Sequence, residues 1–327
     1  MKYQILILCT ILLAGCSLGK PAADQGPALS DYGYIHSGTE GVAASFLEDF
    51  PPASLKISDD IETQVVLDLH NRGAASVKDA SVFLEANPAL VELSVEIKKI
   101  SLEGKSALFS RGETGSLEFD AKIRKLRPEK DAEETDIRAS VCYAYITEAQ
   151  IDACIDTDKY RAERGSAVCS ARVISLSDQG APIALVKVEQ NFIPLRQGGV
   201  QEITPQYVLT FMNVGKGLVI GPHSTDGVCA RNLGWASLTQ SMPFEEDASD
   251  GQIFDVIKVS GQLGGKGLIC GGLYSKEVSL EDGEATVTCI ASSSRAITEP
   301  SMISPLVIRA EYGYLSTITK HIKIEKI

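Results

Sequence analysis

A strand-like segment that occurs twice is the feature that most constrains the fold of this chain. Residues 65–73, VVLDLHNRG, carry an apolar run that ends in Asn-x-Gly, and residues 207–215, YVLTFMNVG, repeat that pattern. A valine follows each copy at the same distance. Asn tolerates a left-handed backbone and Gly supplies positive φ without strain, so each copy predicts a strand, a tight turn and a second strand. The predicted turn residues are Asn71, Gly73, Asn213 and Gly215.

Further short alternating runs occupy the rest of the chain, separated by segments that contain Gly, Pro and Asp. They are residues 80–84, 93–97, 115–121, 184–188 and 253–257. Short strands that recur about every ten residues favour antiparallel β-sandwiches. The best helical candidate is residues 148–163. We therefore expect an all-β chain that forms two tandem immunoglobulin-like antiparallel β-sandwiches.

A second repeated segment indicates an insertion in the second half of the chain. Ile137-Arg138-Ala139 returns as Ile308-Arg309-Ala310, but the two lie further apart than the two Asn-x-Gly segments. The additional residues are expected near 223–251. Each copy is expected to close with a hairpin, the second one turning near Ser316. The predicted divisions are a signal peptide at 1–15, a flexible tether at 16–37, sandwiches at 38–158 and 180–327, and a linker at 159–179.

The first residues predict export and a lipid anchor. Lys2 precedes an apolar run at 5–14, which matches a signal peptide and is shorter than the roughly 20 residues that span a bilayer. Leu13-Ala14-Gly15-Cys16 resembles the lipobox of prokaryotic lipoproteins, and this resemblance implies cleavage before Cys16 and a lipid on its thiol. An ordinary signal peptide is the alternative. The predicted location is the outer face of a cell membrane or the cell surface.

Six cysteines remain beyond the signal and the lipid site, at positions 142, 154, 169, 229, 270 and 289. An even number outside the cytoplasm predicts disulfides. A hairpin that turns at residues 147–150 would place two of them opposite each other, and two strand-like runs carry the last two. The predicted pairs are Cys142–Cys154, Cys270–Cys289 and, by elimination, Cys169–Cys229. Because no C-x-x-C and no Cys/His pair has zinc-ligand spacing, no metal is expected.

Charge and motifs argue against several classes of function. The net charge of −12 disfavours a nucleic-acid partner. None of the four histidines, at 36, 70, 223 and 321, has a second histidine or carboxylate at ligand or triad spacing. Nucleophile-elbow, zinc-protease, phosphate-loop and dinucleotide motifs are also missing. We therefore expect no catalysis and no cofactor.

The candidate ligand-binding residues lie in the predicted insertion. Trp235 is the only tryptophan of the chain, and such a residue can anchor a partner or a sugar or can fill a local core. An acidic loop follows with Glu245, Glu246 and Asp247. Its carboxylates suggest calcium, but their spacing does not fit an EF-hand loop, and a solvated loop is the simpler interpretation.

The segment VVLDLHNRGAASV, residues 65–77, resembles extracellular immunoglobulin-like modules of the CARDB kind. The sequence as a whole is similar to uncharacterised archaeal surface lipoproteins or secreted proteins. The stretches that carry this similarity are GTEG at 38–41, CYAY at 142–145, QGAP at 179–182 and EYGY at 311–314. The resemblance implies a β scaffold without a known activity.

The leading hypothesis is a membrane-anchored lipoprotein that binds or scaffolds a protein or surface polymer. One rival is a secreted hydrolase or carbohydrate-binding accessory protein, with its site around Trp235 and the acidic loop. Another is a subunit of a surface filament or coat.

Overall fold

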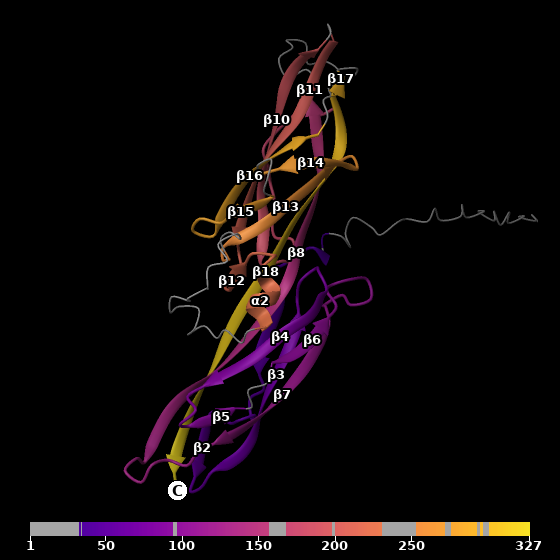
Figure 1. Cartoon of the computed structure of the whole chain (residues 1–327). Coiled ribbons are helices and arrows are strands. Elements are labelled where there is room, and N and C mark those ends of the chain that lie inside the picture. Colours follow the sequence, from indigo (N-terminus) through magenta and orange to yellow (C-terminus); the bar gives the residue numbers. More distant parts are fainter. Residues whose placement is uncertain are drawn as a thin grey trace, which may run out of the picture.

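The computed structural model of this chain describes residues 33, 35–93, 97–156, 168–197, 200–230, 253–271, 276–292, 295–296 and 301–327. Most of these residues lie in β-strands, and the six-residue helix α2 (Thr225–Ala230) packs beside them. The body is elongated (Figure 1). The prediction of an all-β chain with antiparallel sheets is confirmed.

A four-stranded antiparallel sheet lies at the end of the molecule that also holds the C-terminus (Figure 1). Its strands, in spatial order, are β1 (Val42–Phe46), β3 (Ile61–Asn71), β7 (Thr114–Ile123) and β5 (Val91–Leu93). Strand β3 contains the first copy of the sequence repeat. Val65, Leu67 and Leu69 are fully buried at alternate positions along it, as a strand with one face on the core requires, and Val66 between them is buried as well.

A fourteen-stranded sheet runs through the rest of the molecule. Its main path is β6 (Lys98–Leu102), β4 (Val77–Ala86), β8 (Ala132–Asp156), β18 (Ser301–Lys326), β13 (Val256–Leu263), β14 (Lys266–Cys270), β16 (Glu284–Ala291), β11 (Val200–Asn213), β10 (Ile183–Gln197) and β9 (Ile174–Ser175). Four short strands join this path at its sides: β2 (Ser54–Ile57) and β12 (Leu218–Ile220) on β18, β15 (Glu277–Ser279) on β13, and β17 (Arg295–Ala296) on β11.

The central feature is a ribbon of two long strands, β8 and β18. All 25 residues of β8 pair with β18, from Ala132 opposite Glu325 to Asp156 opposite Ser301. At about 3.4 Å per residue, this ribbon is roughly 80 Å long. It crosses the molecule from one end to the other (Figure 1), so it joins the two halves of the chain along its whole length.

Both predicted closing hairpins are wrong, because β8 and β18 continue where the turns were expected. Residues 147–150 carry no Gly, Pro, Asn or Asp that would favour a turn. The alternation of buried side chains instead continues through Thr147, Ala149 and Ile151. Ser316 likewise pairs with Val141 in the middle of the ribbon. The helical candidate at 148–163 is also wrong where it is described, since β8 reaches Asp156.

Three disulfides join all six predicted cysteines. The pair Cys270–Cys289 is confirmed, and it links facing positions of β14 and β16. The other two predicted pairs are wrong: the bonds are Cys142–Cys229 and Cys154–Cys169. The physical reason is that Cys142 and Cys154 lie 12 residues apart on one extended strand, which places them far beyond disulfide reach.

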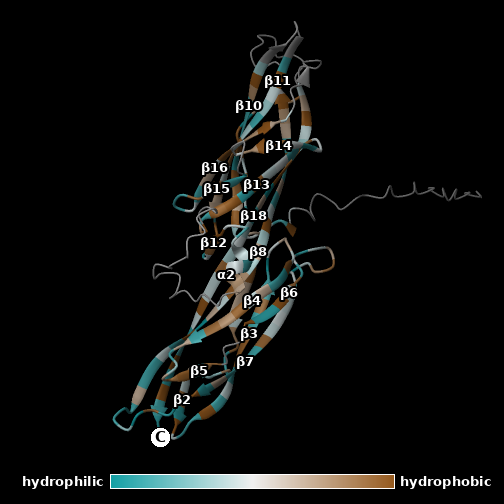
Figure 2. Cartoon of the chain, viewed as in Figure 1, coloured by the Kyte–Doolittle hydropathy of each residue, from teal (hydrophilic) through white to brown (hydrophobic). Residues whose placement is uncertain are grey.

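Most of the buried apolar residues form one core that extends over both halves, from Val42 to Ile324. Apolar and polar positions alternate along the strands (Figure 2). A smaller cluster packs α2 against β8 and β18; its buried members are Phe83, Cys142, Ile220, Val228, Cys229 and Leu315. The Cys142–Cys229 bond lies within this cluster and ties α2 to the ribbon.

The division of the chain into separate sandwich domains at 38–158 and 180–327 stays a prediction. Both β8 and β18 contact strands of each half, so the ribbon belongs to both. The signal peptide, residues 159–167 of the predicted linker, most of the tether, and residues 231–251 of the predicted insertion lie outside the described residues. Among those described, no helix is long and apolar enough to cross a membrane.

Candidate functional site

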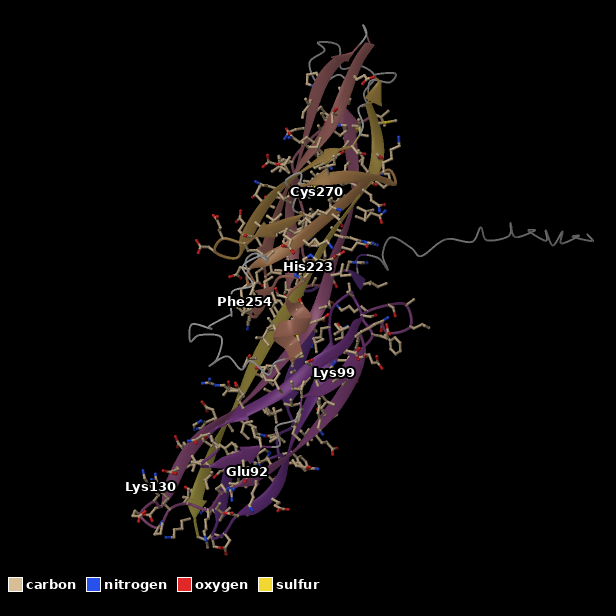
Figure 3. The ribbon with its side chains drawn as sticks, in the orientation of Figure 1. Glu92, Lys99, Lys130, His223, Phe254 and Cys270 are labelled. Carbon is tan, nitrogen blue, oxygen red and sulfur yellow. A yellow bond between two sulfur atoms is a disulfide. The ribbon has the colours of Figure 1, made fainter. Side chains whose placement is uncertain are left out.

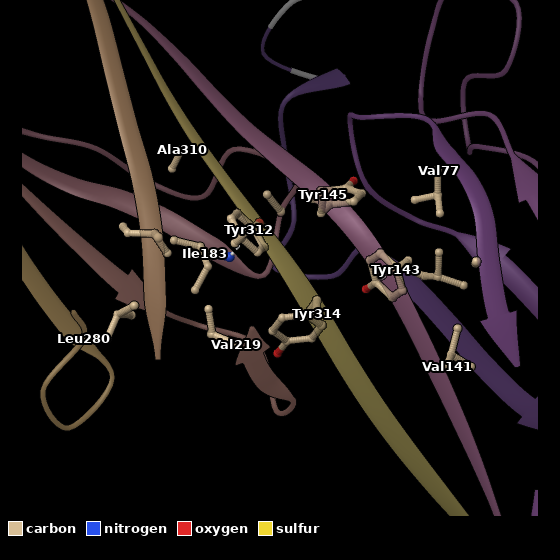
Figure 4. Packing of buried hydrophobic residues seen from close by; sticks show 14 of the residues in the cluster. Val77, Val141, Tyr143, Tyr145, Ile183, Val219, Leu280, Ala310, Tyr312 and Tyr314 are labelled. Atoms are coloured by element: carbon tan, nitrogen blue, oxygen red, sulfur yellow. Dashed lines mark hydrogen bonds between the residues drawn. The ribbon is translucent and has the colours of Figure 1, made fainter. Parts of the chain in front are cut away.

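Four tyrosines meet where the ribbon passes the middle of the molecule, and we call them the central tyrosine cluster. Tyr143 and Tyr145 come from β8, and the register of the ribbon places them opposite Tyr314 and Tyr312 of β18. Neighbouring rings have centroid distances between 5.7 and 6.5 Å (Figure 4). These are tilted and edge-to-face geometries that aromatic pairs favour.

Two of the hydroxyls accept a hydrogen bond from the first residue of a strand, one in each half. The Tyr143 hydroxyl accepts a hydrogen bond from the backbone N–H of Val42 at 3.0 Å. The Tyr312 hydroxyl accepts one from the N–H of Ile183 at 3.3 Å. Val42 and Ile183 are buried at the starts of β1 and β10. Burial of the rings raises the pKa of Tyr143 and Tyr312 well above the usual value, so both phenols remain protonated.

The other two hydroxyls hold the segments that follow the Asn-x-Gly sequences. Tyr145 accepts a hydrogen bond from Ala75 N–H at 3.2 Å, and Tyr314 accepts one from Gly217 N–H at 2.6 Å. The equivalent interactions in the two halves show that the sequence repeat is matched by a repeat of hydrogen bonds. The ribbon supplies one tyrosine pair to each half.

The two asparagines of the repeat have the same function. Asn71 Nδ2 donates to the Ala75 carbonyl at 2.8 Å, and Asn213 Nδ2 donates to the Gly217 carbonyl at 3.1 Å. Each side chain therefore bridges the bend that follows its strand. Neither asparagine has a positive φ, which corrects the reason that the sequence suggested for its presence.

The two glycines of the repeat are required by close approach. Gly73 and Gly215 also lack a positive φ. A Cβ atom on Gly73 would overlap the Tyr145 hydroxyl, and one on Gly215 would overlap the Tyr314 hydroxyl. The Asn-x-Gly sequence thus provides space for the central tyrosine cluster, a function that sequence reasoning missed. The spacing of the two Tyr-x-Tyr segments was the available signal.

A polar cleft of about 700 Å³ opens at the end of the molecule near the C-terminus, and we call it the tip cleft. Its lining residues are Asn87, Ala89, Leu90, Lys125, Arg127, Lys130, Ala132, Glu133 and Glu134. Lys130 lies on the loop at this end (Figure 3). Arg127 and Lys130 both pair with Glu133, at 3.4 and 3.6 Å. The cleft therefore presents cations and carboxylates together, which suits a polar ligand that carries both hydrogen-bond donors and acceptors.

A histidine lies beside this cleft on the neighbouring strand. His321 of β18 faces Asp136 of β8, with Nδ1 at 2.9 Å from the carboxylate, and its Nε2 lies 3.4 Å from Glu134. The hydrogen bond to Asp136 and the nearby Glu134 raise the pKa of His321 above its usual value. All three side chains of this arrangement are exposed, and the raised pKa means that the histidine holds its proton to a higher pH than a free imidazole does.

The candidates predicted from the sequence fall outside this geometry. Trp235, Glu245, Glu246 and Asp247 lie outside the described residues, so their role stays a prediction, as does the calcium alternative. Cys16 also lies outside them. Within the part of the chain that the structure describes, no three His, Cys, Asp or Glu residues gather closely enough to hold a metal ion.

Comparison with known protein families found no match to this sequence. A search of curated proteins found no match either.

Proposed function

We propose that the protein is a lipoprotein, anchored through Cys16 to the outer face of a cell membrane, that binds or scaffolds other molecules and does not catalyse a reaction. The observation that carries this proposal is the ribbon of β8 and β18. It joins both halves of the chain over 25 paired residues and gives the molecule an extended body. Such a body suits the holding of binding surfaces at fixed distances.

We further propose that each half is an immunoglobulin-like module. In the first half, the sheet of β1, β3, β7 and β5 shares a core with β6, β4 and β8. In the second half, β10, β11 and β16 correspond to β1, β3 and β7, while β12 and β18 correspond to β4 and β8, because β12 follows Asn-x-Gly and pairs with β18 as β4 follows it and pairs with β8. The matched hydrogen bonds from Asn71 and Asn213 and from the central tyrosine cluster support this correspondence.

An exported location is supported by the three disulfides. Disulfides form and persist outside the reducing cytoplasm, and the six cysteines after Cys16 all form them. The lipobox-like sequence that ends at Cys16 supplies the proposed anchor. A diacylglycerol at that position would provide two acyl chains, and a stable anchor requires more than one.

Fractionation of cells that produce Cys16→Ser tests the anchor. We expect the unaltered protein in the membrane fraction and the Cys16→Ser protein largely outside it. Cys9→Ser is the matched control, because Cys9 lies within the proposed signal peptide and should not change the distribution. Equal membrane association of the Cys16→Ser and unaltered proteins would contradict the proposal.

The partner in this proposal is a protein or a surface polymer, and the tip cleft is the proposed contact. Its charged residues lie at the end of the body, where a partner can reach them. Retention on isolated cell-surface polymers should fall several-fold in the double variant Arg127→Glu/Lys130→Glu. Lys99→Glu is the control, since Lys99 is exposed on β6, outside the cleft. Unchanged retention of the double variant would exclude the cleft as the contact.

A further inference from the structure

The loop between β6 and β7 exposes two large apolar side chains side by side. This loop, residues 105–112 with the sequence KSALFSRG, carries Leu108 and Phe109 at its tip. Leu108 is 91% exposed and Phe109 is 43% exposed. Isolated apolar side chains are common on protein surfaces, but an adjacent Leu-Phe pair on a projecting loop is a candidate contact with an apolar surface.

Hydrogen bonds within the loop fix its shape before any contact is made. Ser106 N–H donates to the Phe109 carbonyl at 3.0 Å, and Phe109 N–H donates to Ser106 Oγ at 3.1 Å. Gly112 closes the loop with a φ of 79° and donates its N–H to the same Phe109 carbonyl at 2.9 Å. The base is held by His70, whose Nε2 lies 2.7 Å from the Arg111 carbonyl. Little conformational entropy is therefore lost when the tip binds.

The loop also lies where the chain leaves the folded body toward Cys16. Lys105 Nζ, at the start of the loop, donates to the Ser37 carbonyl at 2.7 Å. The first described residues and this loop lie on the same side of the molecule at mid-length (Figure 1). The chain from Cys16 to Ser37 is 21 residue steps long, which gives a root-mean-square reach of about 25 Å as a flexible chain and at most about 75 Å when extended.

We propose that Leu108 and Phe109 insert into the outer region of the lipid bilayer that holds Cys16. This inference rests on the proposed lipid anchor, because the anchor keeps the loop within the reach of the tether and so at a high effective concentration near the membrane. A protein partner could also cover the pair, but the loop's position at the tether exit favours the bilayer.

The charges around the tip indicate the kind of membrane that suits it. Lys105 and Arg111 flank the apolar pair, and Glu103 and Glu113 lie at the two strand ends next to the loop. These charges balance, so insertion depends on apolar burial rather than on attraction to anionic lipid. Zwitterionic phosphatidylcholine vesicles should therefore be sufficient. The loop would bring the middle of the body to the membrane.

Tryptophan fluorescence tests the insertion. Leu108→Trp is made in a full chain that also carries Trp235→Phe, and the processed protein is reconstituted into phosphatidylcholine vesicles with brominated acyl chains. We expect a blue-shifted emission and a loss of intensity through bromine quenching. Val168→Trp in the same background is the control, since Val168 is also exposed but lies beside Ser301 at the end of the ribbon, away from the loop, and its emission should be unchanged.

A second variant measures the contribution of the apolar pair. Leu108→Ser/Phe109→Ser in a chain with Cys16→Ser should bind phosphatidylcholine vesicles at least about tenfold more weakly than Cys16→Ser alone, given the apolar area that is lost. Because both side chains are exposed, their substitution should change the stability of the fold only slightly.

The outcomes separate this inference from the anchor. Mass spectrometry that shows a lipid on Cys16, together with unquenched Leu108→Trp, overturns the loop inference and leaves the anchor standing. If mass spectrometry shows that the chain with its native Cys16 carries no lipid, and Leu108→Trp is still quenched, the loop inference is supported and the anchor is refuted. A spectral shift that requires membrane proteins and is not seen with pure lipid overturns the inference in favour of a protein partner.

Discussion

Removal of one buried hydroxyl, in Tyr312→Phe, should destabilise the fold by about 1–3 kcal/mol. The Tyr312 side chain is 1% exposed, and its hydroxyl accepts the N–H of fully buried Ile183 and shares a hydrogen bond of 2.9 Å with Thr147 Oγ1. Phenylalanine keeps the ring packing but leaves the Ile183 N–H without this acceptor. An unsatisfied buried donor costs about 1–3 kcal/mol.

The free energy of unfolding can be measured by chemical denaturation, with disulfides intact. Tyr143→Phe serves as the matched variant, because its hydroxyl accepts the N–H of Val42 in the other half. The two substitutions should have similar effects, and each should lower the melting temperature by several degrees. A loss below about 0.5 kcal/mol in both variants, the level of an ordinary surface change, would refute the role given to the central tyrosine cluster.

Three further predictions follow from the described contacts. Gly73→Ala should destabilise the fold by about 1–3 kcal/mol through overlap with a tyrosine hydroxyl and two backbone carbonyls, whereas Gly227→Ala, with open space around it in α2, should stabilise it slightly; thermal melts compare the two. Replacing Cys142 and Cys229 by alanine opens a disulfide across 87 residues and should cost about 4–5 kcal/mol, against about 3 kcal/mol for the bonds across 15 and 19 residues, measured by denaturation. An NMR titration should show a pKa of His321 above 6.5; its stabilising effect is complete below the unfolded value and disappears as the pH rises through the folded pKa.

The all-β class could be predicted because single strands carry their own signal. Val65, Leu67 and Leu69 alternate with more exposed or polar positions on β3, and such alternation reflects one buried face. The disulfide between Cys270 and Cys289 was predictable for a related reason. Its two strands, β14 and β16, lie close in sequence, and the stretch between them contains β15 and the turn at Asp282 and Gly283 that the sequence indicated.

The ribbon could not be predicted because it depends on a partner far away in the chain. Tyr145 faces Tyr312, which lies in the other half, and no local pattern specifies such a pairing. A local turn at 147–150 was therefore expected instead, and two of the disulfide predictions failed with it. The residues around Trp235 lie outside the described structure, so a ligand site there stays a prediction.

The central claim is that an exported, lipid-anchored chain carries this disulfide-bonded β body. Peptide mapping of the purified protein by mass spectrometry without reduction tests it most directly. The account predicts an N-terminal peptide that begins at a diacylglyceryl-modified Cys16, together with the linked pairs Cys142–Cys229, Cys154–Cys169 and Cys270–Cys289. An unmodified peptide through Cys16, or free thiols at the other six positions, would contradict it.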